Sequence, residues 1–104
     1  MQQIAPRALA SWLCEEPPLL LDVREAWEVA ISAFPDALHV PMREIPSRLD
    51  ELPARRPIVC ICHHGARSAQ VALFLEHRGF ERVYNLAGGI DAWTREVDAT
   101  IPRY

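Results

Sequence analysis

The residues best suited to chemistry in this chain are gathered in one short segment, CICHHGARS, over positions 60–68. The segment holds two cysteines, two adjacent histidines and an arginine, namely Cys60, Cys62, His63, His64 and Arg67. Thiols, imidazoles and a guanidinium are the groups used by metal sites, redox pairs and cysteine-based catalysis. The spacing of these groups, and the elements that must position them, are needed to choose among those chemistries.

Cys62 has the surroundings of a nucleophile. It follows an apolar run over residues 57–61 that predicts a buried strand, and an amphipathic helix pattern comes soon after it. The free N–H groups and the dipole at the start of a helix favour an anion, here a thiolate or a bound oxyanion. Gly65 permits a sharp bend and Arg67 adds a positive charge. These features favour attack by Cys62 on an electrophilic sulfur or phosphorus atom.

A metal site made from the cysteines and histidines of residues 60–64 is a weaker interpretation. Four donors within five residues do not easily surround one ion tetrahedrally, and structural zinc sites normally combine two separated pairs of ligands. The remaining histidines, His39 and His77, are isolated in the sequence. We therefore expect no bound metal.

The two neighbouring cysteines do not predict a disulfide either. In an extended strand, Cys60 and Cys62 would point the same way with Cα atoms about 6.5–7 Å apart, at the limit of disulfide reach. We therefore expect Cys60 to be a buried apolar residue and Cys14 to be a packing residue of the first helix.

The spacing from cysteine to arginine argues against a phosphatase loop. Cysteine phosphatases use C-x5-R, whereas Cys62 to Arg67 is C-x4-R and Cys60 to Arg67 is C-x6-R. A loop one residue shorter should be too tight for a tetrahedral phosphate, yet able to hold one extra sulfur atom.

Short apolar runs alternate with helical patterns along the chain. We expect strands over residues 19–23, 37–40, 58–61 and 82–86. We expect a first helix that starts at Pro6 and is ended by Pro17-Pro18, and further helices over residues 24–31, 44–52, 68–78 and 90–95. This alternation predicts an α/β fold with a small central parallel sheet and helices on both faces. Ligands bind beyond the carboxyl ends of such strands, which is where CHHGARS lies.

Length and composition exclude several classes of protein. The chain has 104 residues, which predicts one domain over residues 1–104. Its net charge is −3 and no basic stripe is present, so we expect no nucleic-acid partner. No apolar run approaches the ~20 residues of a membrane span, and the N-terminal residues lack a secretory signal. We therefore expect no membrane partner and a cytoplasmic location, where the three cysteines stay reduced.

Three segments together resemble the rhodanese family. CHHGARS, residues 62–68, is similar to the family's C-x-x-G-x-R-S loop. LLDVREAWE, residues 20–28, resembles its first motif, and NLAGGIDAW, residues 85–93, resembles its closing motif. The three stand in the family's order and, with the strand–helix order, cover essentially the whole chain. One departure is SAFPDA at residues 32–37, where members commonly read GHIPGA; it bears on substrate preference rather than on the fold.

The resemblance implies a rhodanese-like fold and a thiosulfate sulfurtransferase activity. In that scheme the Cys62 thiolate takes the outer sulfur of thiosulfate or a persulfide donor, and cyanide or a thiol then removes it. The resemblance implies no cofactor. The same loop would also suit a persulfide carrier or interaction module that delivers sulfur to a partner protein with little thiosulfate turnover.

The resemblance also assigns roles to individual residues. Catalysis falls on Cys62, and the loop that holds the persulfide, mainly through backbone N–H groups, comprises His63, His64, Gly65, Ala66, Arg67 and Ser68. For Arg67, a donor-binding charge and a structural role at the helix start both stay open. The other matching positions are expected to be structural: Asp22 and Arg24 as a pair bracing the loops, Trp27 and Trp93 as packing residues, Gly88 and Gly89 as a turn.

Overall fold

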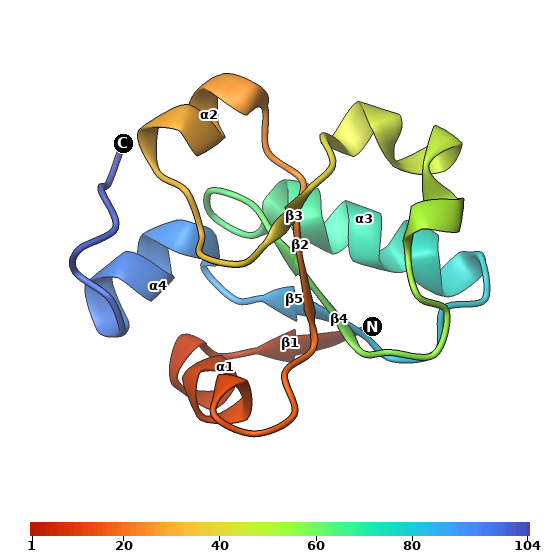
Figure 1. Cartoon of the computed structure of the whole chain (residues 1–104), viewed down its shortest axis with the longest axis horizontal. Coiled ribbons are helices and arrows are strands. Elements are labelled where there is room, and N and C mark those ends of the chain that lie inside the picture. Colours follow the sequence, from red (N-terminus) through yellow and green to blue (C-terminus); the bar gives the residue numbers. More distant parts are fainter.

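The computed structural model describes all residues from 1 to 104 and contains one five-stranded sheet (Figure 1). Its strands are β1 (Gln2–Ile4), β2 (Leu19–Asp22), β3 (Leu38–His39), β4 (Ile58–Ile61) and β5 (Val83–Leu86). The spatial order is β1-β5-β4-β2-β3, and every neighbouring pair is parallel. The prediction of a parallel α/β sheet is confirmed.

Helices cover both faces of the sheet (Figure 1). They are α1 (Pro6–Leu13), α2 (Ala26–Ile31), α3 (Ala66–His77) and α4 (Gly89–Glu96), with two 3₁₀ helices, η1 (Met42–Ser47) and η2 (Leu49–Glu51). Helix α1 packs against α4, and α3 packs against η1. The sheet therefore separates two hydrophobic cores, one under α3 and η1 and one under α1 and α4.

Strand β4 lies in the middle of the sheet and leads directly to Cys62. It pairs with β2 on one side and β5 on the other, and all four of its residues are buried. Ile58 and Cys60 belong to the core under α3, whereas Val59 and Ile61 belong to the core under α4. Burial on both faces explains why this strand is an unbroken apolar run in the sequence.

Helix α3 begins two residues earlier than its apolar pattern predicts, at Ala66 instead of residue 68. Val71 and Leu75 face the sheet and are buried, as their spacing predicts. Gly79 follows the helix with a φ of +93°, a left-handed conformation that favours glycine and ends the helix as expected.

Two other elements differ from the sequence expectation. The predicted helix over residues 44–52 is wrong: the segment forms η1 and η2, and Pro46, which has no N–H to donate, lies inside η1. Strand β1 was not predicted, because Gln2–Ile4 is a mostly exposed edge strand without an apolar run. It pairs with β5, and this pairing places Gln3 beside Asn85.

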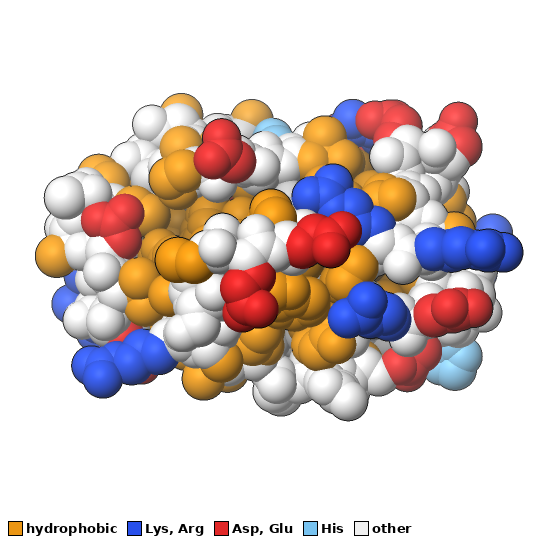
Figure 2. All heavy atoms as spheres, turned by 60° about the horizontal axis from the view of Figure 1, so that its bottom comes forward, with side chains coloured by type: hydrophobic (Ala, Val, Ile, Leu, Met, Phe, Trp, Pro, Cys, Tyr) orange, Lys and Arg blue, Asp and Glu red, His pale blue; other side chains and the backbone are white.

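Figure 2 shows the face that carries α1 and α4, where hydrophobic side chains gather between scattered charged groups. A hollow of about 280 Å³ on this side is lined both by apolar residues, among them Leu13, Phe34 and Trp93, and by the charged residues Asp36, Arg56 and Asp98. No helix of the structure combines the length and the apolar character that crossing a bilayer requires.

The buried position of Cys60 leads to a stability prediction. Its side chain is fully buried, and burial raises the pKa of its thiol to about 12, which keeps it neutral and unreactive. Cys60→Ala should lower the free energy of unfolding by about 1 kcal/mol, the scale for deleting one small buried group. Denaturant unfolding measures this loss, and Cys14→Ser, at an exposed position, is the control that should change little.

The same variant tests the dithiol alternative. Cys60→Ala should leave the reaction of Cys62 with iodoacetamide unchanged. A folded variant in which Cys62 no longer reacts would show that the two thiols work together.

Candidate active site

Cys62 lies immediately after β4 and is only 1 % exposed. Its sulfur has two hydrogen-bonding neighbours: the backbone N–H of Gly65 donates to Sγ at 3.1 Å, and the Ser68 hydroxyl lies 3.2 Å from it. Both neighbours are buried. The sulfur thus lies beside one N–H donor and one hydroxyl group of its own loop, and both can hydrogen-bond to a sulfur anion.

The N-terminus of α4 holds the first part of the loop in place. The carbonyl of Cys62 accepts a hydrogen bond from the N–H of Ile90 at 2.9 Å, and that of His63 accepts one from Asp91 at 3.1 Å. Gly89 permits this approach, since a Cβ there would lie 2.4 Å from the His63 carbonyl oxygen. Because the two carbonyl groups are held by α4, they do not point toward the sulfur.

Gly65 forms the sharp bend before α3. Its φ is +105°, in the left-handed region that favours glycine. Its carbonyl accepts hydrogen bonds from the Asn85 side chain at 3.1 Å and from the Ala69 N–H at 3.2 Å. The loop N–H groups that donate to no protein acceptor are those of His63, His64, Ala66, Arg67 and Ser68. Such free N–H groups at the start of a helix attract an anion.

Arg67 forms a two-point ion pair with Glu28 of α2. Its Nη1 and Nη2 donate to the two carboxylate oxygens at 2.7 and 2.8 Å, and the Tyr104 hydroxyl donates to Oε1 at 2.9 Å. These hydrogen bonds, chiefly those from Arg67, lower the pKa of Glu28 from 4.5 to about 2. The arrangement favours the structural role for the Arg67 side chain, which joins α2 to the start of α3.

The expected pair of Asp22 and Arg24 is buried at the end of β2. Arg24 Nη2 and Nε donate to the Asp22 carboxylate at 2.7 and 3.0 Å, and Nη2 also donates to the Ser32 carbonyl. Burial opposes the charge of Arg24, but hydrogen bonds with Asp22 and Tyr104 outweigh it and raise its pKa. Arg24 Nη1 also donates to the Tyr104 hydroxyl, which in turn donates to Glu28. Tyr104 therefore connects the Asp22–Arg24 ion pair to the Glu28–Arg67 ion pair.

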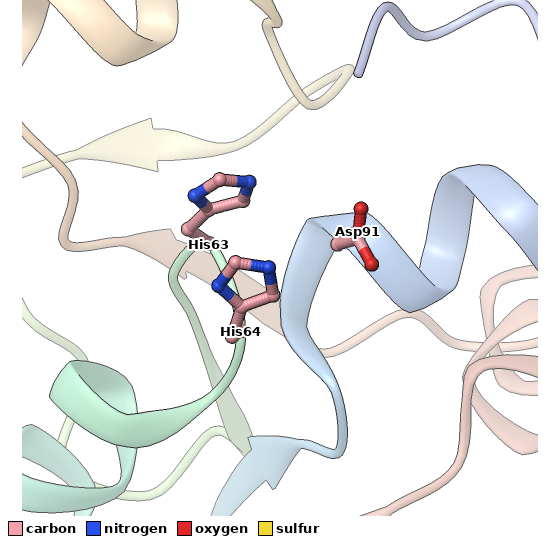
Figure 3. Close-up of side chains that lie close together, drawn as sticks. All are labelled: His63, His64 and Asp91. Atoms are coloured by element: carbon pink, nitrogen blue, oxygen red, sulfur yellow. The ribbon is translucent and has the colours of Figure 1, made fainter. Parts of the chain in front are cut away.

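His63 and His64 lie on the outer side of the loop, near Asp91 of α4 (Figure 3). The two rings are stacked with centroids 3.9 Å apart, and the ring of Tyr104 stacks on His63 at the same distance. Burial and then the neighbouring His64 lower the pKa of His63, which favours its neutral form.

The donor atoms of these three residues lie within 4.8 Å of one another, a spacing that a metal ion could draw together. Both oxygens of Asp91, however, already accept hydrogen bonds, from Arg95 at 3.2 Å and from Arg103 at 3.1 Å. A cation would have to displace these two guanidinium groups. The cluster also differs from the cysteine–histidine set weighed from the sequence.

The two tryptophans differ in environment. Trp93 is buried and packs against Phe34, as predicted. The prediction for Trp27 is wrong: it is 62 % exposed on α2, and its ring meets only the edge of Tyr104. The buried residues of the motif around Trp27 are Asp22, Arg24 and Glu28. Trp27 itself lies on the solvent-exposed side of the short helix α2.

Sequence analysis did not identify Glu28, Asn85 and Tyr104 as parts of this site. Glu28 and Asn85 lie within the segments that match family motifs, and Asn85 is a polar residue within an otherwise apolar strand. That exception was the available signal for Asn85. Tyr104 is distant in sequence from the loop, and only the folded chain brings it to His63.

A hollow of about 440 Å³ opens beside Arg67, on the side of the loop that faces the ion pair with Glu28. It is lined by Val23, Glu25, Met42, Arg43, Pro46 and Arg67. Cys62 does not line this hollow and is almost fully buried.

Comparisons with known proteins agree with this architecture. The family model of the rhodanese-like domain matches residues 5–96. A sulfurtransferase of Allochromatium vinosum is 43% identical over 96 residues, which cover 91% of this chain and 90% of that protein. The thiosulfate sulfurtransferase GlpE of Actinobacillus pleuropneumoniae serotype 3 is 36% identical over 93 residues, which cover 89% and 86% of the two chains. The crystal structure of a rhodanese-like domain protein from Staphylococcus aureus superposes with a TM-score of 0.87 at 30% identity, covering 100% and 99%.

The pair of Arg67 and Glu28 predicts a specific dependence of stability on pH. Because folding lowers the pKa of Glu28 to about 2, its contribution is present above pH 4.5 and is lost as the pH falls toward 2. Glu28→Gln should therefore cost on the order of 1–3 kcal/mol near neutral pH, with the difference from wild type shrinking below pH 4.5.

Denaturant unfolding at a series of pH values measures this difference. Glu51→Gln, which removes the carboxylate of the exposed pair with Arg48, is the control and should show a much smaller effect. A gap between wild type and Glu28→Gln that stays constant from pH 7 to pH 2 would contradict the assignment.

Proposed function

The chain belongs to the rhodanese-like domain family, and from that premise we propose that it is a sulfurtransferase that carries the transferred sulfur as a persulfide on Cys62. The observation that carries the proposal is the surrounding of Cys62 Sγ, which is buried beside the Gly65 N–H and the Ser68 hydroxyl. The sulfurtransferases similar to this chain support the same reaction class.

In the first half-reaction, the Cys62 thiolate attacks the outer sulfur of thiosulfate. A new S–S bond forms at Cys62 while the S–S bond of thiosulfate breaks, and its electron pair leaves with sulfite. Because thiosulfate delivers its outer sulfur at the oxidation level that a persulfide needs, no separate oxidant is required. The N–H groups at the start of α3 favour the anionic forms of both the resting thiol and the persulfide.

In the second half-reaction, a nucleophile attacks the outer sulfur of the Cys62 persulfide. The bond between the two sulfur atoms breaks, its electron pair returns to Cys62, and the thiolate is regenerated. Cyanide would give thiocyanate, and a thiolate acceptor would give a new persulfide. The scheme needs no cofactor, and its covalent intermediate predicts ping-pong kinetics.

The loop residues have distinct parts in this scheme. The backbone N–H groups of residues 63–68 would hold the persulfide. Among them, the N–H of Gly65 already donates to Sγ. The Arg67 side chain is engaged by Glu28, so we assign it to the structure of the loop. Asp22 and Arg24 brace the same region from β2.

The dimensions of the loop support a sulfur donor over a phosphate ester. The four residues between Cys62 and Arg67 are one fewer than in cysteine phosphatases, and the sulfur is almost fully buried. A single sulfur atom is the group that such an enclosure can accept.

We also propose that residues 1–104 form a single cytoplasmic domain. The free thiols of Cys14, Cys60 and Cys62 are in keeping with a reducing compartment.

A persulfide carrier that serves a partner protein is the second candidate. The observation in its favour is an exposed apolar pair on α2, Trp27 at 62 % and Ile31 at 47 % exposure. Trp27 meets Tyr104, which stacks on His63 of the loop, so Trp27 is connected to the Cys62 loop through two ring contacts. An exposed aromatic residue beside a reactive loop suits a macromolecular donor or acceptor.

Steady-state kinetics with two donors distinguish the two candidates. Initial rates of thiocyanate formation from thiosulfate and cyanide should give parallel double-reciprocal lines, and Cys62→Ser should be inactive while Cys14→Ser keeps the wild-type rate. A second assay replaces thiosulfate with a protein persulfide. Negligible turnover of thiosulfate together with fast transfer from the protein donor would favour the carrier, and no transfer in either assay would overturn both candidates.

A further inference from the structure

Both hydrogen-bonding neighbours of the Cys62 sulfur are held by one side chain that is not part of the loop. That side chain is Asn85 of β5, which is 2 % exposed. Its Nδ2 donates to the Gly65 carbonyl at 3.1 Å, and its Oδ1 accepts the hydroxyl proton of Ser68. Asn85 thus contacts the two residues that contact Sγ, without touching Sγ itself.

The orientation of the Asn85 amide is determined by its partners. The carbonyl oxygen of Gly65 can only accept a hydrogen bond, so the NH₂ group must face it. The second hydrogen of Nδ2 points to Gln3 Oε1 at 3.0 Å, in agreement with the pairing of Gln3 and Asn85 between β1 and β5. The amide oxygen is therefore left facing Ser68, where it can only accept.

This orientation also determines what the Ser68 hydroxyl does. The hydroxyl has one proton and two neighbours, Asn85 Oδ1 and Cys62 Sγ. With Cys62 as a thiol, Ser68 donates to Asn85 and accepts from the S–H group. With Cys62 as a thiolate, the same proton can turn toward Sγ over 3.2 Å. Asn85 thus holds the hydroxyl beside the sulfur while Cys62 is a thiol, and its hydrogen bond to the Gly65 carbonyl persists in both states.

We propose that Asn85 is a positioning residue for the Cys62 nucleophile, acting through Gly65 and Ser68, with Gln3 fixing its amide. The proposal rests on the proposed function for its effect on turnover, but its effect on thiol reactivity does not depend on the identity of the sulfur donor. The physical reason is that reaction rates fall steeply when a nucleophile and its hydrogen-bond donors are displaced by even about 1 Å.

If Asn85 only stabilised the fold, its replacement would lower the free energy of unfolding but would not slow the reactions of Cys62 in the folded protein. Thr94 of α4 is also buried, and its hydroxyl has no hydrogen-bond partner. Thr94→Val therefore removes a buried polar group without changing any contact to Gly65 or Ser68. It serves as the matched control for burial and polarity.

The test uses the full chain carrying Cys14→Ser, which removes the one exposed thiol. Burial raises the pKa of Cys60 to about 12 and keeps that thiol unreactive, so Cys62 is the thiol to follow. Asn85→Leu removes the hydrogen bonds to Gly65 and to Ser68 and keeps a side chain of similar volume. We expect it to lower kcat for sulfur transfer by about 10- to 100-fold with a smaller change in KM, and to slow alkylation of Cys62 by iodoacetamide. Thr94→Val should change neither rate.

Two further variants keep the proposal testable if Asn85→Leu folds poorly. Asn85→Asp keeps the acceptor for Ser68 but loses the donor to Gly65, and Ser68→Ala loses the other arm; each should slow both reactions. Combining Ser68→Ala with Asn85→Leu should cost less than the sum of the two single effects, because Asn85 acts in part through Ser68.

The outcomes separate this inference from the proposed function. Folded Asn85 variants that keep wild-type alkylation and kcat would overturn the positioning role, even if sulfur transfer is real. Slow alkylation in the variants of a protein that transfers no sulfur would support the positioning role and overturn the proposed function.

Discussion

The site depends on the hydrogen bonds between the N-terminus of α4 and the carbonyl groups of Cys62 and His63. These bonds satisfy two N–H groups of α4 and, at the same time, direct two loop carbonyls away from the sulfur. Gly89 is required for the approach, because a side chain there would collide with the His63 backbone. The outcome is a loop in which the Gly65 N–H donates to the sulfur and the Ser68 hydroxyl lies beside it, while the two carbonyls held by α4 turn away.

A second layer of contacts fixes this loop relative to the sheet. The buried ion pair of Asp22 and Arg24 at the end of β2 is connected through the Tyr104 hydroxyl to Glu28, and Glu28 holds Arg67 at the start of α3. Asn85 supports the loop from β5. Asp22, Arg24 and Glu28 are buried, and buried charges are stable only when paired, so these ion pairs also restrict how the elements can move.

The sequence was sufficient to predict the parallel sheet, the strand that carries Cys62 and the helix that follows, because buried strands and amphipathic helices leave periodic apolar patterns. It did not reveal β1, since an exposed edge strand needs no apolar residues, or the 3₁₀ turns around Pro46. The loop residues followed from the resemblance of CHHGARS to the family's active-site loop. The partners of that loop, Glu28, Asn85 and Tyr104, come from distant parts of the chain, and local patterns do not specify which distant polar groups meet.

The central claim is that Cys62 accepts one sulfur atom, and the intact mass of the protein after exposure to thiosulfate tests it most directly. The account predicts that wild type and Cys14→Ser gain the mass of one sulfur atom, that cyanide removes it, and that Cys62→Ser gains nothing. A sulfur adduct that persists in Cys62→Ser, or no adduct on wild type with either thiosulfate or a protein persulfide donor, would contradict the account.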